Sequence, residues 1–329
     1  MSSRALLAVR ISPADVGRRV TVRRRLDAST ATDVVGHLRS WDGGWDGALL
    51  VERRDGSVVE VAAADLLAAR VVPPEISAEA MQAVAESGWP PEERAALGEW
   101  TLRAAGGVTG RANSVRVAGR PGMPVEDALA TVERWYADRA LPPLLQVPAP
   151  SAYDDALAAL GWVVTRRTVL LTTATDDLLA RAGARPSTDV TTVRSVDPSP
   201  QWLALVEPDV EAEPLARILA RPRDVVFVEV RDAASGVLLG GGRASAASSP
   251  VGRWAGLTSI MTVPEARRRG VATRILHELA TWASEAGCRH TYLQVLDENA
   301  TARRLYTGLG FGFHHAYVYL APGRGPGRA

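Results

Sequence analysis

Hydrophobic residues follow two different periods in the C-terminal third of the chain. Residues 255–263 form an apolar run that predicts a strand, whereas Val271, Ile275 and Leu279 recur at helical spacing. Residues 264–270, which contain three arginines, separate the two. The pattern therefore predicts a strand, a turn and an amphipathic helix, in that order.

The same order of elements occurs a second time in the middle of the chain. There the pattern predicts a helix over 125–135, a strand over 144–147 and a helix over 153–160. In the C-terminal part, the first helix leads to a strand over 292–295 and to a second helix that ends near Gly308. The predicted elements of the two parts follow in the same order and can be aligned with gaps of single residues. We therefore interpret them as a diverged internal repeat.

The first 74 residues have a different pattern, of short strands separated by turns. It predicts a small β-barrel similar to SH3-like or Sm-like modules. Pro73 and Pro74 mark its end, because proline fits neither a helix interior nor a central strand. We expect the barrel to pack on the neighbouring domain. The expected strands are 20–23, 33–38, 48–51 and 57–61, with a hairpin turn at 54–56.

The composition excludes several classes of protein. The 38 basic residues are all arginine and face 37 acidic residues, and a formal net charge of +1 argues against electrostatically driven nucleic-acid binding. No stretch has the apolar length of a membrane span, and the N-terminus does not resemble a signal peptide. Cys288 is the single cysteine, so neither an internal disulfide nor a thiolate metal site is expected. We expect a cytoplasmic protein without a metal.

The turn at 264–270, here called the arginine-glycine turn, has the character of an anion site. A helix that begins after such a turn leaves backbone N–H groups unpaired at the positive end of its dipole. Gly270 has no Cβ to block an anion, and Arg267–Arg269 add positive charge. The turn matches neither a P-loop nor Gly-x-Gly-x-x-Gly. The alternative is a surface turn that only caps the helix.

Two stretches carry a resemblance to a known family. Arg267–Ala272 resembles the acetyl-CoA loop of the GCN5-related N-acetyltransferases, Gln/Arg-x-x-Gly-x-Gly/Ala. Asn299–Phe311 resembles their second signature, Asn-x-x-Ala-x-x-Leu-Tyr-x-x-x-Gly-Phe. The resemblance implies that acetyl-CoA (coenzyme A) binds within residues 188–321. The residues expected to contact it are Met261, Thr262, Val263, Arg267, Arg268, Arg269, Gly270, Val271, Ala272, Thr273, Asn299, Ala302 and Tyr306.

The resemblance also implies roles for single residues. Tyr306 would protonate the leaving thiolate, the backbone of Met261 and Val263 would contact the acetyl carbonyl and pantetheine, and Asn299 would bond the pantetheine or a nearby water. Each has a structural alternative. Tyr306 also fits an aromatic that packs against Phe311, and Asn299 is a favoured helix cap.

The middle copy differs where the cofactor would bind. Residues 119–124 lack the Arg-x-x-Gly-x-Ala pattern and contain two prolines, and Leu157 stands in place of Tyr306. We expect this copy to keep the fold without the cofactor, to complete the sheet and to form a wall of the acceptor site. Arg111 and Asn113 resemble a stretch of actinobacterial acetyltransferases with an SH3-like barrel and a tandem fold. They would orient an acceptor carboxylate or amide, or form a buried hydrogen-bonded cluster.

No motif identifies the general base, which must take a proton from the attacking amine. Glu229, on a strand predicted over 225–230, is the candidate catalytic base. The alternatives are a water chain or another acidic residue, and each carboxylate also fits a solvated surface charge. Further candidates are Glu207, Glu211 and Glu213, whereas Glu265 fits a structural role and His314 and His315 stay ambiguous.

The sequence therefore predicts a mixed α+β protein in which an SH3-like barrel precedes tandem acetyltransferase folds, the first degenerate. Its predicted activity is transfer of an acetyl group from acetyl-CoA to a primary amine by direct attack in a ternary complex. The acceptor stays open among protein amines, aminoglycosides, polyamines and amino acids, as does the oligomeric state. The predicted domains are 1–74, 75–187 and 188–321, followed by a disordered tail over 322–329.

Two other functions fit parts of the sequence. One is an acyl-CoA sensor that binds the cofactor without acetylating an acceptor; Tyr306 argues against it, because a sensor needs no proton donor. The other is an adaptor for nucleic acid or protein that works through the barrel. Its basic residues would be Arg18, Arg19, Arg23, Arg24 and Arg25.

Overall fold

The structure is a computed structural model that describes residues 9–44, 46–183 and 189–323. The chain forms two compact units, Met1–Glu75 and Ile76–Ala329. No helix in these described ranges is long and apolar enough to cross a membrane. The six residues of the predicted tail from 324 onward lie outside the described residues.

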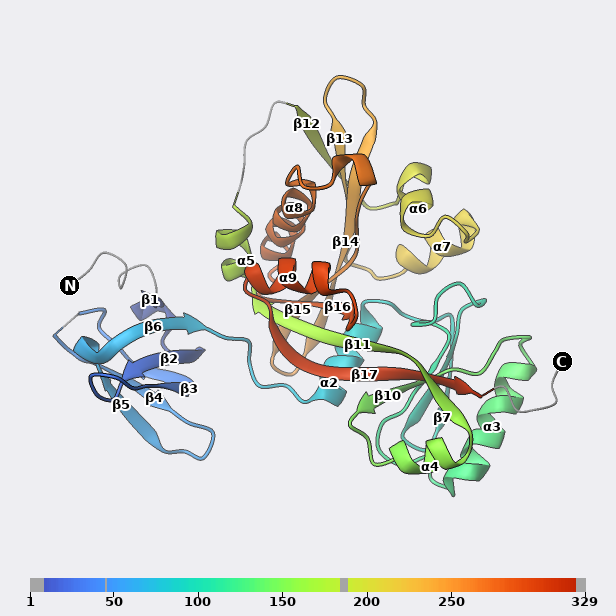
Figure 1. The fold of residues 1–329 in the computed structure, drawn as a ribbon, viewed down its shortest axis with the longest axis horizontal. Coiled ribbons are helices and arrows are strands. Elements are labelled where there is room, and N and C mark those ends of the chain that lie inside the picture. The colour runs from blue at the N-terminus through green and yellow to red at the C-terminus, as the bar shows by residue number, and fades with distance from the viewer. Residues whose placement is uncertain (1–8, 45, 184–188, 324–329) are drawn as a thin grey trace. The chain divides into compact units, whose positions relative to one another are not determined.

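The first unit is a six-stranded sheet with the order β1-β6-β2-β3-β4-β5 (Figure 1). The predicted strands and the predicted hairpin are all present, because alternate residues such as Val20 and Val22 are fully buried in the unit's own core. The β4–β5 hairpin turns at Gly56, whose φ of +81° suits glycine. The strands are β1 Val9–Arg10, β2 Arg19–Arg25, β3 Ala31–Ser40, β4 Ala48–Glu52, β5 Val58–Ala62 and β6 Leu66–Val71, with short 3₁₀ turns at Pro13–Asp15 and Ala63–Asp65.

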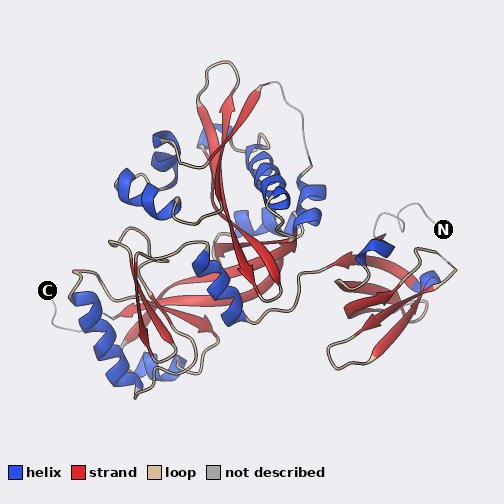
Figure 2. Cartoon of the chain, turned by 180° about the vertical axis from the view of Figure 1, so that it is seen from behind, coloured by secondary structure: helices blue, strands red, loops and turns tan. Residues whose placement is uncertain are grey.

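The second unit is built on one eleven-stranded sheet with helices on both faces (Figure 2). Its strand order is β12-β13-β14-β15-β16-β11-β17-β10-β9-β8-β7. The strands are β7 Glu93–Leu97, β8 Trp100–Ala104, β9 Val115–Arg116, β10 Leu145–Ala149, β11 Trp162–Ala174, β12 Val190–Ser195, β13 Val225–Asp232, β14 Leu238–Ser249, β15 Gly252–Thr262, β16 His290–Leu296 and β17 Gly312–Pro322. The helices are α2 Ala78–Ser87, α3 Val125–Ala137, α4 Asp154–Ala159, α5 Thr175–Ala182, α6 Pro200–Val206, α7 Ala212–Leu219, α8 Val271–Glu285 and α9 Ala300–Gly308, with a 3₁₀ turn, η3, at Pro264–Ala266.

The two halves of this unit exchange their last strands. Below, the middle half is residues 76–183 and the C-terminal half is residues 189–323. Strand β11 of the middle half pairs with β16 of the C-terminal half, and β17 of the C-terminal half pairs with β10 of the middle half. β11 and β17 also pair with each other, with Thr168 opposite Tyr317, and they run side by side in Figure 1. The strand β17 includes Pro322, which the sequence had assigned to the tail.

The order of elements in the two halves is the repeat that the sequence predicted. In each half a strand leads to a long helix, then to a parallel neighbouring strand and a second helix: β9, α3, β10 and α4 in the first, β15, α8, β16 and α9 in the second. The halves do not form separate sheets, however, because their exchanged strands are the centre of one continuous sheet.

Strand β14 carries glycines where helices pack closely on both of its faces. A Cβ added to Gly242 would lie 2.6 Å from the side chain of Ile275 on α8, and one added to Gly241 would lie 2.5 Å from Trp202 on α6. The glycines therefore let α8 and α6 pack directly on the sheet. The face under α8 holds the largest apolar cluster, which also includes Leu178 of α5 and Tyr306 of α9.

The strand exchange leads to a prediction. Residues 189–323, expressed without residues 76–183, should not fold, because β16 then lacks β11, and β17 lacks both of its neighbours. Co-expression of residues 76–183 as a second chain should restore the fold. Circular dichroism and size-exclusion chromatography of both preparations test this. A folded monomer of residues 189–323 would show that the exchanged strands are dispensable.

Candidate active site

A gap separates the outer parts of the parallel strands β15 and β16. Their pairing covers Trp254–Leu257 and His290–Leu293 and ends there, although both strands continue. At the same point β15 bulges away from its ladder with β14, and Ser259 has a φ of +54°. The strand gap, as we call it, thus lies between residues 258–262 and 294–296.

Of the three consecutive residues Met261–Val263 that were predicted to contact the cofactor, Thr262 has backbone groups without a partner on β14. The N–H of Val263 donates to the carbonyl of Leu239 at 3.0 Å, and its carbonyl accepts from Ala266 at 3.0 Å. Met261 lies two residues earlier on the same ladder, so its backbone N–H and carbonyl also point toward β14, as those of Val263 do. The N–H and carbonyl of Thr262 point the other way, into the strand gap.

Apolar side chains are left uncovered beside this gap. Met261 at the end of β15 and Leu296 at the end of β16 are each 39% exposed. Uncovered apolar groups beside unpaired strand ends fit the binding of an extended chain with both polar and apolar parts.

The arginine-glycine turn provides an open anion site at the start of α8. Gly270 has a φ of +81°, and a Cβ there would meet no atom within 4 Å. No side chain caps α8, and its first backbone bond runs from the N–H of Arg274 to the carbonyl of Gly270, so the preceding N–H groups have no helical acceptor. A pocket of about 320 Å³ lies beside the turn. It is lined by Asp189, Val190, Val230, Arg268, Arg269, Gly270, Val271 and Arg274.

The remaining residues of the turn that were predicted to contact the cofactor do not line this pocket. Arg267 is exposed, whereas Ala272 and Thr273 are half-buried in the first turn of α8. Their N–H groups, with those of Val271, belong to the uncapped end of the helix. The pocket therefore offers positive side chains and backbone donors together, which suits a diphosphate.

Helix α9 carries the two polar residues of the second signature. The side-chain oxygen of Asn299 accepts the N–H of Ala302 at 3.0 Å, so Asn299 caps the helix as the structural alternative proposed. Tyr306 is buried, and its ring lies 5.9 Å from that of Phe311. Its hydroxyl makes no hydrogen bond to any residue in the described ranges. Burial raises the pKa of Tyr306 to about 12.

In the middle half, a side chain of the protein fills the corresponding turn. The carboxylate of Glu99 accepts the N–H of Arg120 at 2.5 Å. A Cβ on Gly119 would lie 2.3 Å from the same carboxylate, so this side chain occupies the space beside the turn. Leu157, at the position of Tyr306, is fully buried in the apolar core. These contacts support the interpretation of the middle half as a copy without cofactor.

A second cleft, of about 250 Å³, begins at the free end of β16. We call it the arginine cleft, and both halves form it because of the strand exchange. Its walls come from β11, β16 and β17, from the loop before β9 and from the segment after α6. The residues that line it are Trp89, Thr109, Gly110, Arg111, Arg166, Thr168, Glu207, Gln294, Leu296, Tyr317 and Tyr319.

Arg111 and Asn113, predicted together, have different environments. Arg111 lines the arginine cleft. Asn113 is buried, accepts the N–H groups of Ala105 and Gly107 at 2.7 and 2.9 Å, and donates to the carbonyl of Thr109 at 2.7 Å. Asn113 therefore belongs to the buried cluster that was the structural alternative, and it shapes the loop that carries Arg111.

The acidic residues considered as the general base lie in different parts of the structure. Glu207 lines the arginine cleft. Glu229 is buried on β13, where both Nε and Nη2 of Arg231 donate to one of its oxygens. Glu211 and Glu213, at the start of α7, and Glu265, in η3, are exposed.

The histidines of β17 lie near α2 instead of the strand gap. His315 is within 2.7 Å of both Gln82 and His314 through ring nitrogens. Burial lowers the pKa of both histidines, that of His315 to about 4, with a further contribution from His314. His315 is therefore neutral near pH 7.

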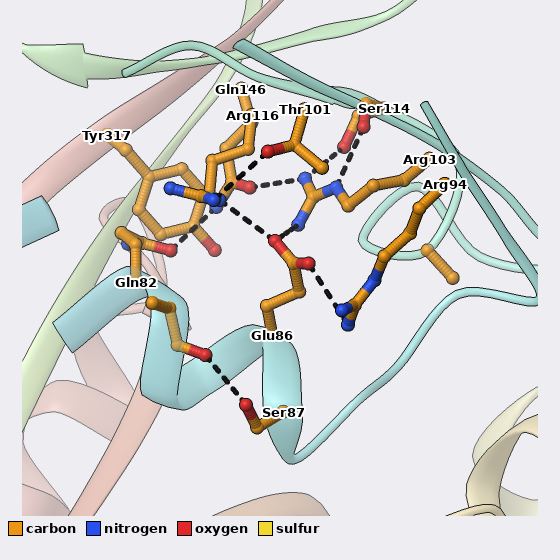
Figure 3. Close-up of polar contacts among 12 residues, drawn as sticks. Gln82, Glu86, Ser87, Arg94, Thr101, Arg103, Ser114, Arg116, Gln146 and Tyr317 are labelled. Carbon is orange, nitrogen blue, oxygen red and sulfur yellow. Dashed lines mark hydrogen bonds and ion pairs between the residues drawn. The ribbon is translucent and has the colours of Figure 1, made fainter. Parts of the chain in front are cut away.

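Two buried arginines on corresponding strands of the halves have different partners. Arg103 on β8 lies 3.5 Å from the carboxylate of Glu86, which Arg94 and Arg116 also reach, at 3.1 and 2.8 Å (Figure 3). Arg243 on β14 is 0% exposed and has no acidic partner in the described chain. It donates to the carbonyls of Leu219 and Gly88, each at 2.9 Å, and to the hydroxyl of Thr258 at 3.3 Å.

Those two carbonyls lie at the C-terminal ends of α7 and α2, so helix dipoles stabilise the charge of Arg243 in place of a carboxylate. Burial, and to a lesser extent the nearby positive charge of Arg111, lower the pKa of Arg243 to about 9. Thr258 is the first residue of β15 beyond its pairing with β16. A cationic group thus borders the strand gap on the side of the arginine cleft.

The comparisons with known proteins identify the family. The family described as "Probable histone acetyltransferase Rv0428c C-terminal" matches residues 77–320, and that described as "Rv0428c N-terminal Sm-like domain" matches residues 14–70. The chain belongs to this family of GCN5-related acetyltransferases. The Sm-like description fits one of the two barrel types that the strand pattern had predicted.

Individual relatives agree with this assignment. "Probable histone acetyltransferase Rv0428c" of Mycobacterium tuberculosis is 30% identical over 321 residues, which cover 93% of this chain and 95% of the relative. "Uncharacterized N-acetyltransferase YobR" of Bacillus subtilis is 27% identical over 242 residues, 70% of this chain and 93% of its own. The solved GCN5-related N-acetyltransferase from Kribbella flavida shares the fold, with a TM-score of 0.58, 19% identity and coverage of 77% of this chain and 98% of that one.

Several groups at the acetyltransferase site were not found from the sequence. Arg166, Gln294 and Tyr319 reach the arginine cleft through strands that the exchange brings together, and Glu99 fills a turn 21 residues away along the chain. No local pattern marks these residues, because their roles depend on long-range strand pairing. For Arg243, the sequence did offer a signal: three consecutive glycines precede it, which indicates that other elements pack closely on this strand.

The environment of Glu86 leads to a second prediction. Glu86→Gln should lower the free energy of unfolding by about 3 kcal/mol, because it leaves Arg103 buried without a counter-ion. Glu278→Gln, which breaks a half-buried ion pair with Arg194, should cost less than about 1 kcal/mol. Urea denaturation of both variants measures the difference. Equal losses would mean that Arg103 does not depend on Glu86.

Proposed function

We propose that this protein is an acetyl-CoA-dependent N-acetyltransferase that acetylates a primary amine by direct attack in a ternary complex. The observation that supports it best is the strand gap with the open arginine-glycine turn at its end. There, Gly270 leaves free space beside uncapped N–H groups and arginines, as a diphosphate requires. Thr262 offers backbone groups to the amide-bearing arm, and Met261 and Leu296 offer apolar surface.

Acetyl-CoA would supply the acetyl thioester. The proposed task of Tyr306 is to donate the proton that the departing thiolate needs. Its hydroxyl is free of hydrogen bonds to described residues, and burial keeps its pKa near 12, so it remains protonated well above neutral pH. The packing of its ring against Phe311 fixes the direction of the hydroxyl and is compatible with this role.

The attacking amine must lose its proton to a base. Among the acidic residues, Glu207 has the better-supported position, because it lines the cleft that begins at the free end of β16. Glu229 stays a candidate, but its carboxylate is already bound by Arg231, which reduces its availability for proton transfer. We therefore propose Glu207, directly or through a water, as the base.

We further propose one cofactor per chain, since the Glu99 carboxylate takes the anion position of the middle half. An adaptor function of the barrel has less support. Three of its basic residues are engaged inside the unit: Arg18 with Asp15, and Arg19 and Arg24 with backbone carbonyls. A sensor that only binds the cofactor would not need a buried, unbonded tyrosine hydroxyl.

Gly270→Val should abolish acetyl-CoA binding, because the branched side chain fills the space of the phosphates. Gly270→Ala tests the same space with a smaller group, and Gly287→Ala is the matched control at the other end of α8. Gly287 has a φ of +73° and equally open surroundings, so both alanines carry the same conformational cost of about 1–2 kcal/mol.

Calorimetric titration measures the affinity and the number of sites of each variant. We expect one site in the wild type, loss of binding in both Gly270 variants and wild-type affinity in Gly287→Ala. Unchanged affinity in Gly270→Val, or two sites in the wild type, would contradict the proposed cofactor site.

Tyr306→Phe should lower kcat by roughly 10²–10⁴-fold and leave acetyl-CoA affinity nearly unchanged, because it removes the hydroxyl and keeps the packed ring. This range corresponds to about 3–5 kcal/mol of lost transition-state stabilisation. Steady-state kinetics with an accepted amine, together with calorimetry, separate the two effects. Full turnover of the variant would leave Tyr306 as a packing residue.

A further inference from the structure

The arginine cleft contains two guanidinium groups stacked on aromatic rings. The guanidinium carbon of Arg111 lies 4.7 Å from the centre of the Trp89 ring, and that of Arg166 lies 4.2 Å from the centre of the Tyr319 ring. Stacking on a ring fixes the plane of a guanidinium and leaves its N–H edge free to bind another group.

Neither arginine has an acidic partner or a hydrogen bond among the described residues, and the Nε of Arg111 is buried without one. Another stacked arginine of this chain is different: Arg139 lies 3.8 Å from the Trp135 ring centre and is paired with Glu93 at 2.9 Å. Two stacked arginines that face one cleft without a counter-ion therefore form an incomplete anion site.

The position of the cleft connects this anion site to the reaction. Gln294 and Leu296 line it from β16, beyond the point where β16 separates from β15. The buried guanidinium carbon of Arg243 lies 5.2 Å from the centre of the Trp89 ring, which lines the cleft, and its charge adds positive potential on that side. Glu207 is the acidic residue among those that line the cleft, and it suits an ammonium group. The cleft thus presents groups for an anion and for an amine together.

We propose that Arg111 and Arg166 bind the carboxylate of the acceptor, so that the substrates of this enzyme are amines that carry a carboxylate, such as amino acids. This inference rests on the proposed acetyltransferase function. Arginine binds a carboxylate through paired, charge-assisted hydrogen bonds, and two unpaired guanidinium groups repel a polycation. Polyamines and lysine-rich peptides are therefore poor acceptors.

The test compares matched amines in an assay of free coenzyme A release by the full chain. L-Phenylalanine and phenethylamine differ only by a carboxylate, as do glycine and methylamine, and spermidine represents polycations. We expect kcat/KM to be at least about 10-fold higher for each carboxylate-bearing member, the minimum expected of a charge-assisted pair. Equal values within both pairs, or a preference for spermidine, would overturn the proposal.

Variants of the two arginines connect this selectivity to the cleft. Arg111→Gln and Arg166→Gln should raise KM for the carboxylate-bearing amine by about 10-fold or more and reduce the preference for L-phenylalanine over phenethylamine by the same factor. Arg111→Lys should recover part of the loss, because lysine restores the positive charge without the paired N–H donors of a guanidinium. Arg223→Gln, at an exposed arginine outside the cleft, is the control. Unchanged selectivity in both glutamine variants would overturn the proposal.

Direct binding separates this inference from the proposed function. Calorimetry of L-phenylalanine without acetyl-CoA should give binding to the wild type and at least about 10-fold weaker binding to Arg111→Gln. If it does while no amine is acetylated, the carboxylate site stands and the acetyltransferase proposal fails. If phenethylamine and methylamine are acetylated as well as their partners, the activity stands and the carboxylate site fails.

Discussion

The pairing of β11 with β17 is the interaction on which the second unit depends. Each of these strands ends its own half of the chain, and each lies beside the other half in the sheet. Neither half can complete its apolar core alone, because Val169 and Leu171 of β11 belong to the cluster under α8, and Val318 and Leu320 of β17 belong to the cluster under α3. We therefore expect the fold to require the middle half, even though the turn of that half is filled by Glu99.

This pairing also explains the composition of the site. The strand gap arises within the C-terminal half, where two parallel strands separate after four residue pairs. Its anion-binding end is formed by α8 of the same half. Its other end meets β11 and β17, so that Arg166 and Tyr319 lie beside Arg111 from the loop before β9. In the proposed reaction, donor and acceptor are thus bound by different parts of the chain, and we expect turnover to require both halves to be folded together.

The sequence predicted those features that depend on local order. Helix and strand periods located α3, β10, α4, α8, β16 and α9, and the turn before α8 predicted unpaired backbone donors at the start of that helix. Family resemblance supplied the roles of Tyr306 and Asn299, and the structure shows the latter acting as a cap. The strand exchange was not predicted, because strand neighbours far apart in sequence leave no periodic signal. The contact of Glu99 with the turn at Arg120 and the packing around Arg243 join residues at least 15 positions apart, so they also leave no periodic signal.

The Glu99 contact in the middle half has a consequence for how such a repeat evolves. A binding turn that loses its ligand leaves backbone donors to be satisfied by water or by another part of the chain. In the middle half, the carboxylate of Glu99 on the neighbouring hairpin accepts the N–H of Arg120 at this turn, and Gly119 makes room for it with a φ of +59°. On our interpretation of the middle half as a copy without cofactor, its anion position is now occupied by a side chain of the framework. Such a copy contributes strands and surface to its twin instead of binding a cofactor of its own.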